Sequence, residues 1–484
     1  MPKKEPEVQN QQSNQLTAKK QDFSSWYSQI LSAAEVIDKR YNIKGMFVWL
    51  PYGYKAMLNI KAIWDKLYQE NGIKEMYFPL LIPKEYAEIN DSWFKGFKDE
   101  AFWVKAGSEK KPNYILRPTG EPAMYPMFKL WTRTYSDLPI RIYETVSSFR
   151  YETKHTRPLI RDREITVWYE IHTAHETKEE SEKEAKLHEE IQKQIWKKLA
   201  INPIIVQKPG WECFPGAIGA VEFFNIMPTG KIMENGSINL LGQSYSKKFE
   251  ITFKDKKGKI QNPWMVCTGN GARLLAAVIA IHGDDKGLII PPEIAPVKIV
   301  IIPIIFKKQE KEIITKVKQV QQQLKKAGME AEADLGQESP GSKFYNWELK
   351  GVPIRIEIGP RDIKNKSVTM VRRDTSQKIT VKEKDIMTIA VKTLADIQQS
   401  LLKKAEKLTQ EKIKKITNKK EIKTAVEKGF VVQAGWCGSG KCWDKVKEIQ
   451  EGIEIFGSQQ ANTKTTCIIC SKPCSQVGYI GNTY

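Results

Sequence analysis

The sequence has no apolar run long enough to cross a membrane. Its apolar stretches, such as VKIVIIPIIF at 297–306, fall well short of the roughly 18 residues that a transmembrane helix needs. The N-terminal MPKKEPEVQNQQSNQ contains no apolar core of the kind that a secretion signal carries. We find no internal repeat either. These absences lead us to expect a cytoplasmic protein without a membrane partner.

Cysteine is scarce over most of the chain. Only Cys213 and Cys267 precede residue 437, whereas the other five of the seven cysteines fall in the last 48 residues. Because cytosolic thiols stay reduced, such a local cluster favours a metal site over disulfides.

The clustered cysteines form two closely spaced pairs. Cys437 and Cys442 make a Cys-x4-Cys pair, and Cys467 and Cys470 make a Cys-x2-Cys pair. Four thiolates suit tetrahedral Zn²⁺, so we predict a structural zinc site. Free thiols are the alternative, and Cys474 is a spare that could replace one ligand.

The same segment contains a pattern that imitates a phosphate-binding loop. Gly435, Gly440 and Lys441 fit G-x4-G-K, but Cys442 stands where a Ser or Thr should contact magnesium. Without an expected strand-to-helix context, we interpret the residues as part of the metal site.

Acidic residues are outnumbered by basic ones. The formal charge of +20 and the pI near 9.3 favour a polyanionic partner, because each cation beside a phosphate releases counterions. Nucleic acid is the leading interpretation, and a basic protein that binds none is the alternative. A length of 484 residues suggests about three domains.

Sequence patterns divide the chain into four parts. Residues 1–22 are nearly free of large apolar groups, which predicts a disordered tail. Residues 23–292 mix helical periods with strand-like runs such as ITVWYEIHT, which predicts an antiparallel sheet flanked by helices in an α+β catalytic domain. Residues 293–402 alternate buried strands with helices, as in a small α/β domain. Residues 403–484 form the zinc-binding C-terminal domain.

The passage from Phe149 to His175, FRYETKHTRPLIRDREITVWYEIHTAH, carries the strongest chemical signal. Arg150 and Glu152 alternate along a predicted strand, which would place both on one face, and Arg161 follows a loop. Such a face offers a guanidinium to a phosphate and a carboxylate to an amino group. A solvated charged strand is the alternative.

This passage resembles motif 2 of class II aminoacyl-tRNA synthetases, and HTRPLIR followed by REIT resembles the archaeal-type prolyl-tRNA synthetases. MYFPLL at 76–81 resembles motif 1, whose proline, here Pro79, lies at the family's dimer interface. RPTGE at 117–121 resembles the loop that binds the amino acid, and ARLLAAVIAIHGDDKGLIIPP at 272–292 resembles motif 3. The resemblance covers roughly residues 23–400 and continues more weakly to Tyr484.

The resemblance implies an antiparallel-sheet active site, a homodimer, and a two-step reaction of ATP, Mg²⁺ and proline that loads tRNA, with no role for DNA. It assigns Arg150 to the α-phosphate and the amino-acid carboxylate, and Glu152 to the adenine amino group. Arg161 is assigned to the γ-phosphate, and Arg273 to the adenine face and the γ-phosphate. Arginine suits these tasks because its planar fork binds oxygen pairs and stays charged.

Two further residue sets follow from the resemblance. The amino-acid site comprises Thr119, Glu121, Arg150, Glu170, His172 and Asn239. The ATP site comprises Arg150, Glu152, Arg161, Glu234, Ser237, Gly271 and Arg273. Glu234 could help to hold Mg²⁺, although a surface carboxylate is the simpler interpretation of an isolated glutamate.

Several positions depart from the family pattern. Ser237 and Asn239 stand where the family usually has threonine and histidine, Thr268 replaces an aromatic residue, and Ile171 replaces Gly or Ala. We expect Thr268 to open space in the pocket and Ile171 to take space from another side.

Proline remains the expected substrate, because Thr119, Glu121, Glu170 and His172 persist. A paralogue that activates a different amino acid is the first alternative. A catalytically silent, synthetase-like RNA-binding or regulatory protein is the second alternative, and retention of all four predicted catalytic residues argues against it.

The segment SPGSKFYNWELKGVPIRIEIGPRD at 339–362 resembles the family's anticodon-binding domain, although Leu335, Gly336 and Gln337 replace the usual D-R-D ahead of it. Flipped bases need stacking surfaces and hydrogen-bonding groups, which aromatic and charged side chains supply. The predicted tRNA contacts are Lys343, Trp347, Glu348, Arg355 and Arg361.

Overall fold

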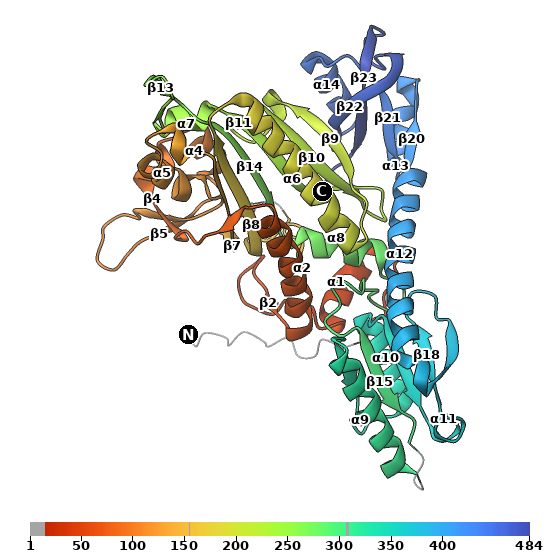
Figure 1. The fold of residues 1–484 in the computed structure, drawn as a ribbon. Coiled ribbons are helices and arrows are strands. Elements are labelled where there is room, and N and C mark those ends of the chain that lie inside the picture. The colour runs from red at the N-terminus through yellow and green to blue at the C-terminus, as the bar shows by residue number, and fades with distance from the viewer. Residues whose placement is uncertain (1–14, 154, 306–308) are drawn as a thin grey trace, which may run out of the picture. The chain divides into compact units, whose positions relative to one another are not determined.

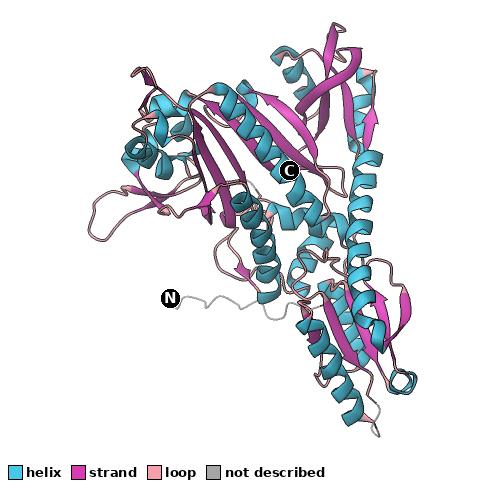
Figure 2. Cartoon of the chain, viewed as in Figure 1, coloured by secondary structure: helices cyan, strands magenta, loops and turns pink. Residues whose placement is uncertain are grey.

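The computed structural model describes residues 15–153, 155–305 and 309–484 (Figures 1 and 2). The described residues form two compact units. The first comprises residues 15–42, 47–56, 282–305 and 309–397, and the second comprises 43–46, 57–153, 155–281 and 398–484. Residues 1–14 of the predicted tail lie outside the described residues, whereas Lys20 donates its backbone N–H to Asp285 at 2.8 Å.

An eleven-stranded sheet forms the centre of the second unit. Neighbouring strands are antiparallel except at its two ends, where β3 pairs with β7 and β20 with β21 in parallel. This arrangement confirms the predicted antiparallel core. In sheet order the strands are β20 (Ile413–Lys415), β21 (Val431–Trp436), β23 (Pro473–Asn482), β22 (Ile453–Thr466), β9 (Ile204–Pro209), β10 (Gly219–Ile226), β11 (Ile232–Gly242), β14 (Trp264–Asn270), β8 (Glu164–His175), β7 (Ile140–Phe149) and β3 (Lys74–Glu75).

Helix α6 (Lys178–Leu199) covers one face of this sheet and contacts β8, β11 and β14 (Figure 1). A capping box between Thr177 and Glu180 starts the helix, because each side chain accepts a backbone N–H that the first turn leaves free. Its buried face includes His188, whose Nδ1 lies 2.9 Å from Thr268 Oγ1 of β14. The opposite face of the sheet is therefore the one left for a ligand.

Short elements surround that opposite face. Trp93, Tyr125 and Phe128 belong to a hydrophobic cluster beside it. The elements that supply this cluster are β4 (Leu81–Pro83), α3 (Lys84–Glu88), α4 (Asp91–Phe97), β6 (Tyr114–Leu116), α5 (Glu121–Trp131) and α7 (Ser244–Lys248). Strand β5 (Phe102–Val104) pairs with β6, β12 (Phe253–Lys254) pairs with β13 (Ile260–Gln261), and α8 (Arg273–His282) follows β14. Helix α2 (Pro51–Glu70) lies on the α6 side instead, since the ring centres of Trp64 and Tyr169 are 4.5 Å apart and Gln192 of α6 donates to the Tyr68 hydroxyl.

The C-terminal segment extends the same sheet, since β22 pairs with β9 through Ser458 and Gln207. It also has its own hydrophobic cluster, in which Trp436, Trp443 and Val446 are buried. Helices α13 (Ile422–Glu427) and α14 (Gly440–Lys447) belong to this segment. The C-terminal part of the chain is thus continuous with the catalytic sheet.

The first unit contains a five-stranded mixed sheet. All five residues of β15 are buried, which confirms the buried strand predicted from the apolar run at 297–306. The strands in sheet order are β16 (Ala331–Ala333), β15 (Ile299–Pro303), β17 (Ile354–Ile358), β18 (Ser367–Arg372) and β19 (Lys378–Lys382). The helices are α1 (Phe23–Ala33), α9 (Glu310–Lys326), α10 (Pro340–Lys350), α11 (Pro360–Asn365) and α12 (Ile386–Lys412), whose last part belongs to the second unit, and β1 (Ile37–Asp38) pairs with β2 (Val48–Trp49).

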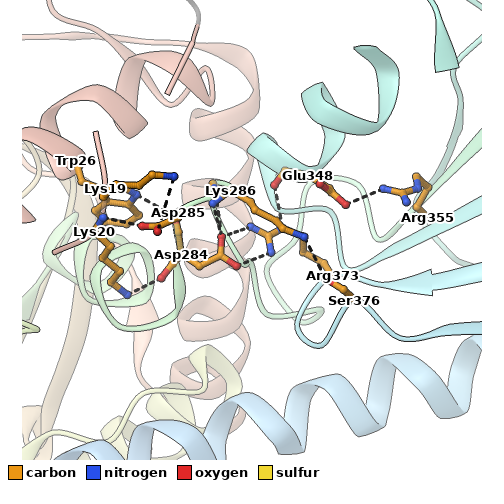
Figure 3. A network of polar contacts seen from close by, with 12 residues as sticks. Lys19, Lys20, Trp26, Asp284, Asp285, Lys286, Glu348, Arg355, Arg373 and Ser376 are labelled. Carbon is orange, nitrogen blue, oxygen red and sulfur yellow. Dashed lines mark hydrogen bonds and ion pairs between the residues drawn. The ribbon is translucent and has the colours of Figure 1, made fainter. Parts of the chain in front are cut away.

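A polar network joins distant segments of the first unit (Figure 3). Arg373 donates two hydrogen bonds to the Asp284 carboxylate, at 2.9 and 2.6 Å, and a third to the Glu348 carbonyl oxygen at 2.9 Å. Trp26 donates to the Asp284 carbonyl oxygen at 2.9 Å. A bidentate pair of this kind fixes both partners in direction as well as distance.

Among the described residues, we find no helix that is both long and apolar enough to span a bilayer.

Candidate active site

A cavity of about 240 Å³ lies on the face of the large sheet opposite α6. It is enclosed by β8, β10, β11 and β14 together with the first residues of α5 and α8. The sequence-predicted residues that line it are Thr119, Glu121, Arg150, Glu170, His172, Glu234, Ser237, Asn239, Gly271 and Arg273.

Arg150 lies at the end of β7 and not within it. The strand ends at Phe149, and the Glu152 N–H donates to the Arg150 carbonyl oxygen at 2.7 Å, so the backbone turns directly after the strand. The prediction that Arg150 and Glu152 share one strand face was therefore wrong. The Arg150 N–H still donates across the hairpin to the Arg163 carbonyl oxygen at 2.9 Å, but the turn at Glu152 ends the ladder there.

The Arg150 guanidinium is nevertheless held firmly in the cavity. It lies 5.6 Å from the ring centres of both Phe97 and Trp168, and its Nε donates to the Pro118 carbonyl oxygen at 3.2 Å. Aromatic rings attract the cation while leaving its planar fork able to bind oxygen atoms.

Glu152 and Arg161 pair with each other but are not among the residues that line the cavity. Arg161 Nε lies 3.9 Å from Glu152 Oε2, and Arg161 Nη2 donates to the Tyr484 carbonyl oxygen at 2.9 Å. The last residue of the chain therefore contacts the motif 2 loop.

Arg273 begins α8 and connects this helix to two other parts of the cavity. Its Nε donates to the Ile160 carbonyl oxygen at 2.8 Å, and its Nη1 donates to the Glu234 carbonyl oxygen at 3.1 Å. The Glu234 carboxylate lies 3.5 Å from the same nitrogen. This arrangement places a cation and a carboxylate side by side at one end of the cavity.

The other end of the cavity is supported by a buried charge network. Arg117 donates to Glu144 and, at 3.0 Å, to Glu170, and all three side chains are at least 95% buried. Trp168 Nε1 donates to Glu170 Oε1 at 2.6 Å. Burial acts to raise the pKa of Glu170, but the contacts with His172 and Arg117 lower it to about 2. Glu170 is therefore a fixed anion.

Glu121 is a second buried carboxyl group at this end. Thr119 donates its hydroxyl to Glu121 and accepts a hydrogen bond from Trp93 Nε1 at 2.9 Å. Burial raises the pKa of Glu121, and neighbouring His172 offsets only part of the rise. A cationic ligand would reverse that effect by stabilising the carboxylate.

Strand geometry shows how the two residues expected to reshape the pocket, Ile171 and Thr268, are placed. Trp168, Glu170 and His172 alternate along β8 and face the cavity, so Ile171 points to the other side of the sheet. The Thr268 hydroxyl contacts His188 of α6, which is also on that side. The prediction that Ile171 takes space from the pocket was therefore wrong. Thr268 does line the cavity, although its hydroxyl contacts α6, so the prediction that it opens space stays a prediction.

Cys267 is a cavity residue that the sequence interpretation missed. The register places it opposite His172 of β8 and Asn239 of β11, so three side chains form a row across three strands. Burial, together with Glu121 and Glu170, raises the pKa of the Cys267 thiol. The sequence contains no signal for this row, because strand register is a tertiary property.

Glu222 of β10 also lines the cavity without having been predicted. Burial and nearby Glu234 raise the pKa of the Glu222 carboxyl to about 7, although Lys208 Nζ lies 3.0 Å away. The sequence around Glu222 gives no signal for its place in the cavity, because most residues of β10 are buried on both faces.

The predicted tRNA-contacting residues lie in the part of the first unit that contains the five-stranded sheet. Lys343 is 3% exposed, and its ammonium donates to the carbonyl oxygens of Asp334 and Gly336 at 3.0 and 2.7 Å. Trp347 Nε1 donates to the Asp334 carboxylate at 2.8 Å. Lys343 and Trp347 therefore hold the loop that contains Leu335 and Gly336.

The other three predicted contacts differ in their surroundings. Arg355 pairs with Glu348 at 3.0 Å and with Glu357 at 2.9 Å, whereas Arg361 is exposed. Arg361 is the most accessible of the five to an RNA loop.

The four predicted zinc ligands lie together, with all sulfur atoms within 4.8 Å of one another. Cys437 Sγ lies 3.6 Å from Cys442 Sγ and 3.7 Å from Cys470 Sγ. These separations suit a tetrahedron with Zn–S bonds of about 2.3 Å. Cys474 is not a member of this group.

The segment that fits the G-x4-G-K pattern does lie between a strand and a helix, contrary to our expectation, because β21 ends at Trp436 and α14 starts at Gly440. Its Cys437 and Cys442 nevertheless belong to the sulfur cluster, which supports the metal interpretation.

Comparisons with known proteins agree with this geometry. The family model described as the class II core domain of tRNA synthetases for G, H, P, S and T matches residues 102–282, and the anticodon binding domain matches residues 298–393. The fold and the arginine-lined cavity therefore define a class II aminoacyl-tRNA synthetase.

Two curated relatives are the proline--tRNA ligases of Methanobrevibacter smithii and Pyrococcus horikoshii. They are 40% and 39% identical to this chain over 96% of its length, and the matches cover 100% and 98% of the relatives. The solved Giardia lamblia prolyl-tRNA synthetase, in complex with prolyl-adenylate, has a TM-score of 0.93 at 32% identity, covering 97% of this chain and 99% of that one. The chain belongs to the prolyl-tRNA synthetase family.

Proposed function

We propose that the protein activates proline with ATP, forms prolyl adenylate, and transfers the prolyl group to tRNA(Pro). The single observation that carries this proposal is the cavity, which combines a positioned guanidinium, Arg150, with the buried carboxylates Glu121 and Glu170. The Arg150 guanidinium fits an anionic phosphate and the carboxylate of an amino acid, and the two buried carboxylates fit the secondary ammonium group of proline. Family membership with proline--tRNA ligases supports the same reaction.

Each residue has a role in this proposal. Arg150 draws the proline carboxylate and the α-phosphate together, because a fixed cation offsets the repulsion between two anions. Glu121, oriented by Thr119, accepts the proline nitrogen. Arg273 and the Arg161–Glu152 pair bind the nucleotide. Mg²⁺ would neutralise phosphate charge when bound. Glu234, beside Arg273, and Glu222 would provide carboxylate oxygen atoms to hold it.

Amino-acid choice is tested by ATP–pyrophosphate exchange with all twenty amino acids. We expect proline to give the highest kcat/KM, with neighbours of similar size at least about tenfold lower, because one methylene is worth roughly 1–3 kcal/mol in a pocket. A higher value for another amino acid would establish the paralogue alternative. Retained ATP binding with no exchange for any amino acid would favour the silent alternative.

We also propose a tRNA-binding, cytoplasmic homodimer. The net charge of +20 supports contact with RNA. Support for the dimer comes from the motif 1 segment, where Met76, Tyr77 and Leu81 are 38%, 72% and 45% exposed. Neighbouring exposed apolar side chains mark association surfaces.

The dimer is tested by sedimentation equilibrium. We expect the wild-type mass to be twice that of one chain and Leu81→Asp to shift it toward the monomer, because an interface does not tolerate an unpaired buried charge. Leu130→Asp is the matched control, since Leu130 is also exposed, at 66%, but lies outside motif 1. A monomeric wild-type protein contradicts the proposal.

The last part of the proposal is a structural Zn²⁺ held by Cys437, Cys442, Cys467 and Cys470. Support comes from the sulfur separations and from Cys467, whose pKa is lowered to about 7 by backbone N–H groups although burial acts against ionisation. A thiolate is the form that binds zinc.

A further inference from the structure

The amino-acid end of the cavity brings together three side chains of different chemistry. Glu121, His172 and Cys267 each place a ligand atom within 4.8 Å of the other two, and all three side chains are buried. Carboxylate, imidazole and thiolate are the ligand types of Zn²⁺ sites in proteins, and three protein ligands with an open fourth position are typical of reactive zinc. This group is separate from the four-cysteine cluster.

The fold holds these ligands in place from several elements. Cys267 of β14 lies directly opposite His172 of β8, and its Sγ is 4.0 Å from Glu121 Oε1 at the start of α5. Zinc bonds of about 2.0–2.3 Å require ligand atoms roughly 3.3–3.8 Å apart. A contraction of about 1 Å would therefore complete the geometry.

Neighbouring groups orient the ligands as in known metal sites. The Tyr125 hydroxyl lies 2.9 Å from His172 Nδ1, which fixes the imidazole ring, while Nε2 is 3.6 Å from Glu170 Oε2. The contact with Glu170 is longer than a normal hydrogen bond, so Nε2 is the nitrogen at which a metal can replace it. Thr119 fixes the other oxygen of Glu121. Such partners of the ligands commonly set ring orientation and ligand basicity.

The local charge also favours a cation. Glu121, Glu144 and Glu170 are all buried around the single Arg117 guanidinium, which contacts two of them. Buried anions that exceed their cationic partners are stabilised by an added positive charge. Proline supplies that charge through its nitrogen, and a divalent metal ion supplies more of it.

We propose that Glu121, His172 and Cys267 form a second metal site, which binds a thiophilic divalent cation such as Zn²⁺ and excludes proline. The exclusion rests on the proposed function, in which Glu121 accepts the proline nitrogen. Binding forms a metal–sulfur bond and breaks the S–H bond of Cys267, and the proton leaves to the buffer. Free zinc therefore acts as an inhibitor that competes with proline.

The test uses full-length protein that retains its C-terminal zinc, titrated with Co²⁺ and then Zn²⁺ alone. We expect one further equivalent of metal and a thiolate-to-cobalt charge-transfer band in the near ultraviolet. Cys267→Ser and His172→Gln should lose both, with affinity falling by more than the roughly 10- to 100-fold that changes around metal ligands cause. The matched control is Cys213→Ser, which changes a half-buried thiol outside this group and should keep the extra equivalent.

Competition separates this inference from the proposed function. At a proline concentration ten times its dissociation constant, mutual exclusion raises the apparent Kd of the metal about elevenfold. Metal binding that is absent, or indifferent to proline, in a protein that exchanges pyrophosphate with proline overturns the inference and leaves the function intact. The inference is also overturned if Cys267→Ser and His172→Gln are both folded and still bind the extra equivalent of metal. Failure of every amino acid in the exchange assay overturns the function, while the cobalt titration still decides the site.

Discussion

Replacing Arg150 with alanine lowers proline-dependent ATP–pyrophosphate exchange by about 10²- to 10³-fold in kcat/KM, the usual loss when one preorganised donor to a developing anion is removed. The guanidinium is fixed by Phe97, Trp168 and the Pro118 carbonyl oxygen before any ligand arrives. Its removal leaves two anions to approach without a cation between them. The measurement is steady-state exchange with saturating ATP.

Two controls interpret that result. Arg133→Ala removes an equally basic side chain, which is 79% exposed and lies 3.9 Å from Asp137, and should leave exchange unchanged. Arg150→Lys should recover part of the loss, because lysine keeps the charge but not the planar fork. If Arg150→Ala retains full exchange while its unfolding transition matches the wild type, the assignment of motif 2 is wrong.

Sequence patterns predicted the parts of this site that depend on local order. The predicted strand-like run ITVWYEIHT lies within β8, and the apolar run at 297–306 contains a buried strand. Most predicted ligand-binding residues line one cavity. These features follow from periodicity and from motifs within a few residues of one another.

The features that the sequence did not reveal depend on register and on chain direction. Cys267 meets His172 only because β14 and β8 pair at that offset, and a shift by one residue would turn Cys267 to the α6 side. The same alternation explains why Ile171 does not line the cavity. Arg150 left its predicted strand because the chain turns immediately after Phe149.

The contact between Arg161 and Tyr484 links the C-terminal domain to the motif 2 loop. The sequence predicted only a structural role for its zinc. However, β23 carries the chain from the sulfur cluster to Tyr484, whose carbonyl oxygen accepts a hydrogen bond from Arg161 of the motif 2 loop. Disorder in the cluster would therefore reach a residue proposed to bind the γ-phosphate.

Replacing Cys437 with serine should reduce the tightly bound zinc from about one per chain to a small fraction, because the Cys437 sulfur lies 3.6 Å from that of Cys442 and 3.7 Å from that of Cys470. Zinc binding supplies about 10–16 kcal/mol in isolated zinc-finger peptides, but this domain has its own hydrophobic cluster and should lose local order without unfolding globally. Elemental analysis after exhaustive dialysis, without chelator, measures the first effect.

The consequence for catalysis separates a structural zinc from an incidental one. In Cys437→Ser, we expect hydrogen exchange to accelerate along β22 and β23 and the KM for ATP to rise, since Arg161 loses the partner that orients it. Cys474→Ser is the matched control, because Cys474 is near the sulfur cluster in the sequence without belonging to it. This variant should keep its zinc, its protection from hydrogen exchange along β22 and β23, and the wild-type KM for ATP. Wild-type protein that contains no zinc and has seven freely titratable thiols would refute the site. Loss of zinc without faster exchange in β22 and β23 would show that the metal does not support this hairpin, and that Tyr484 is held by the sheet alone.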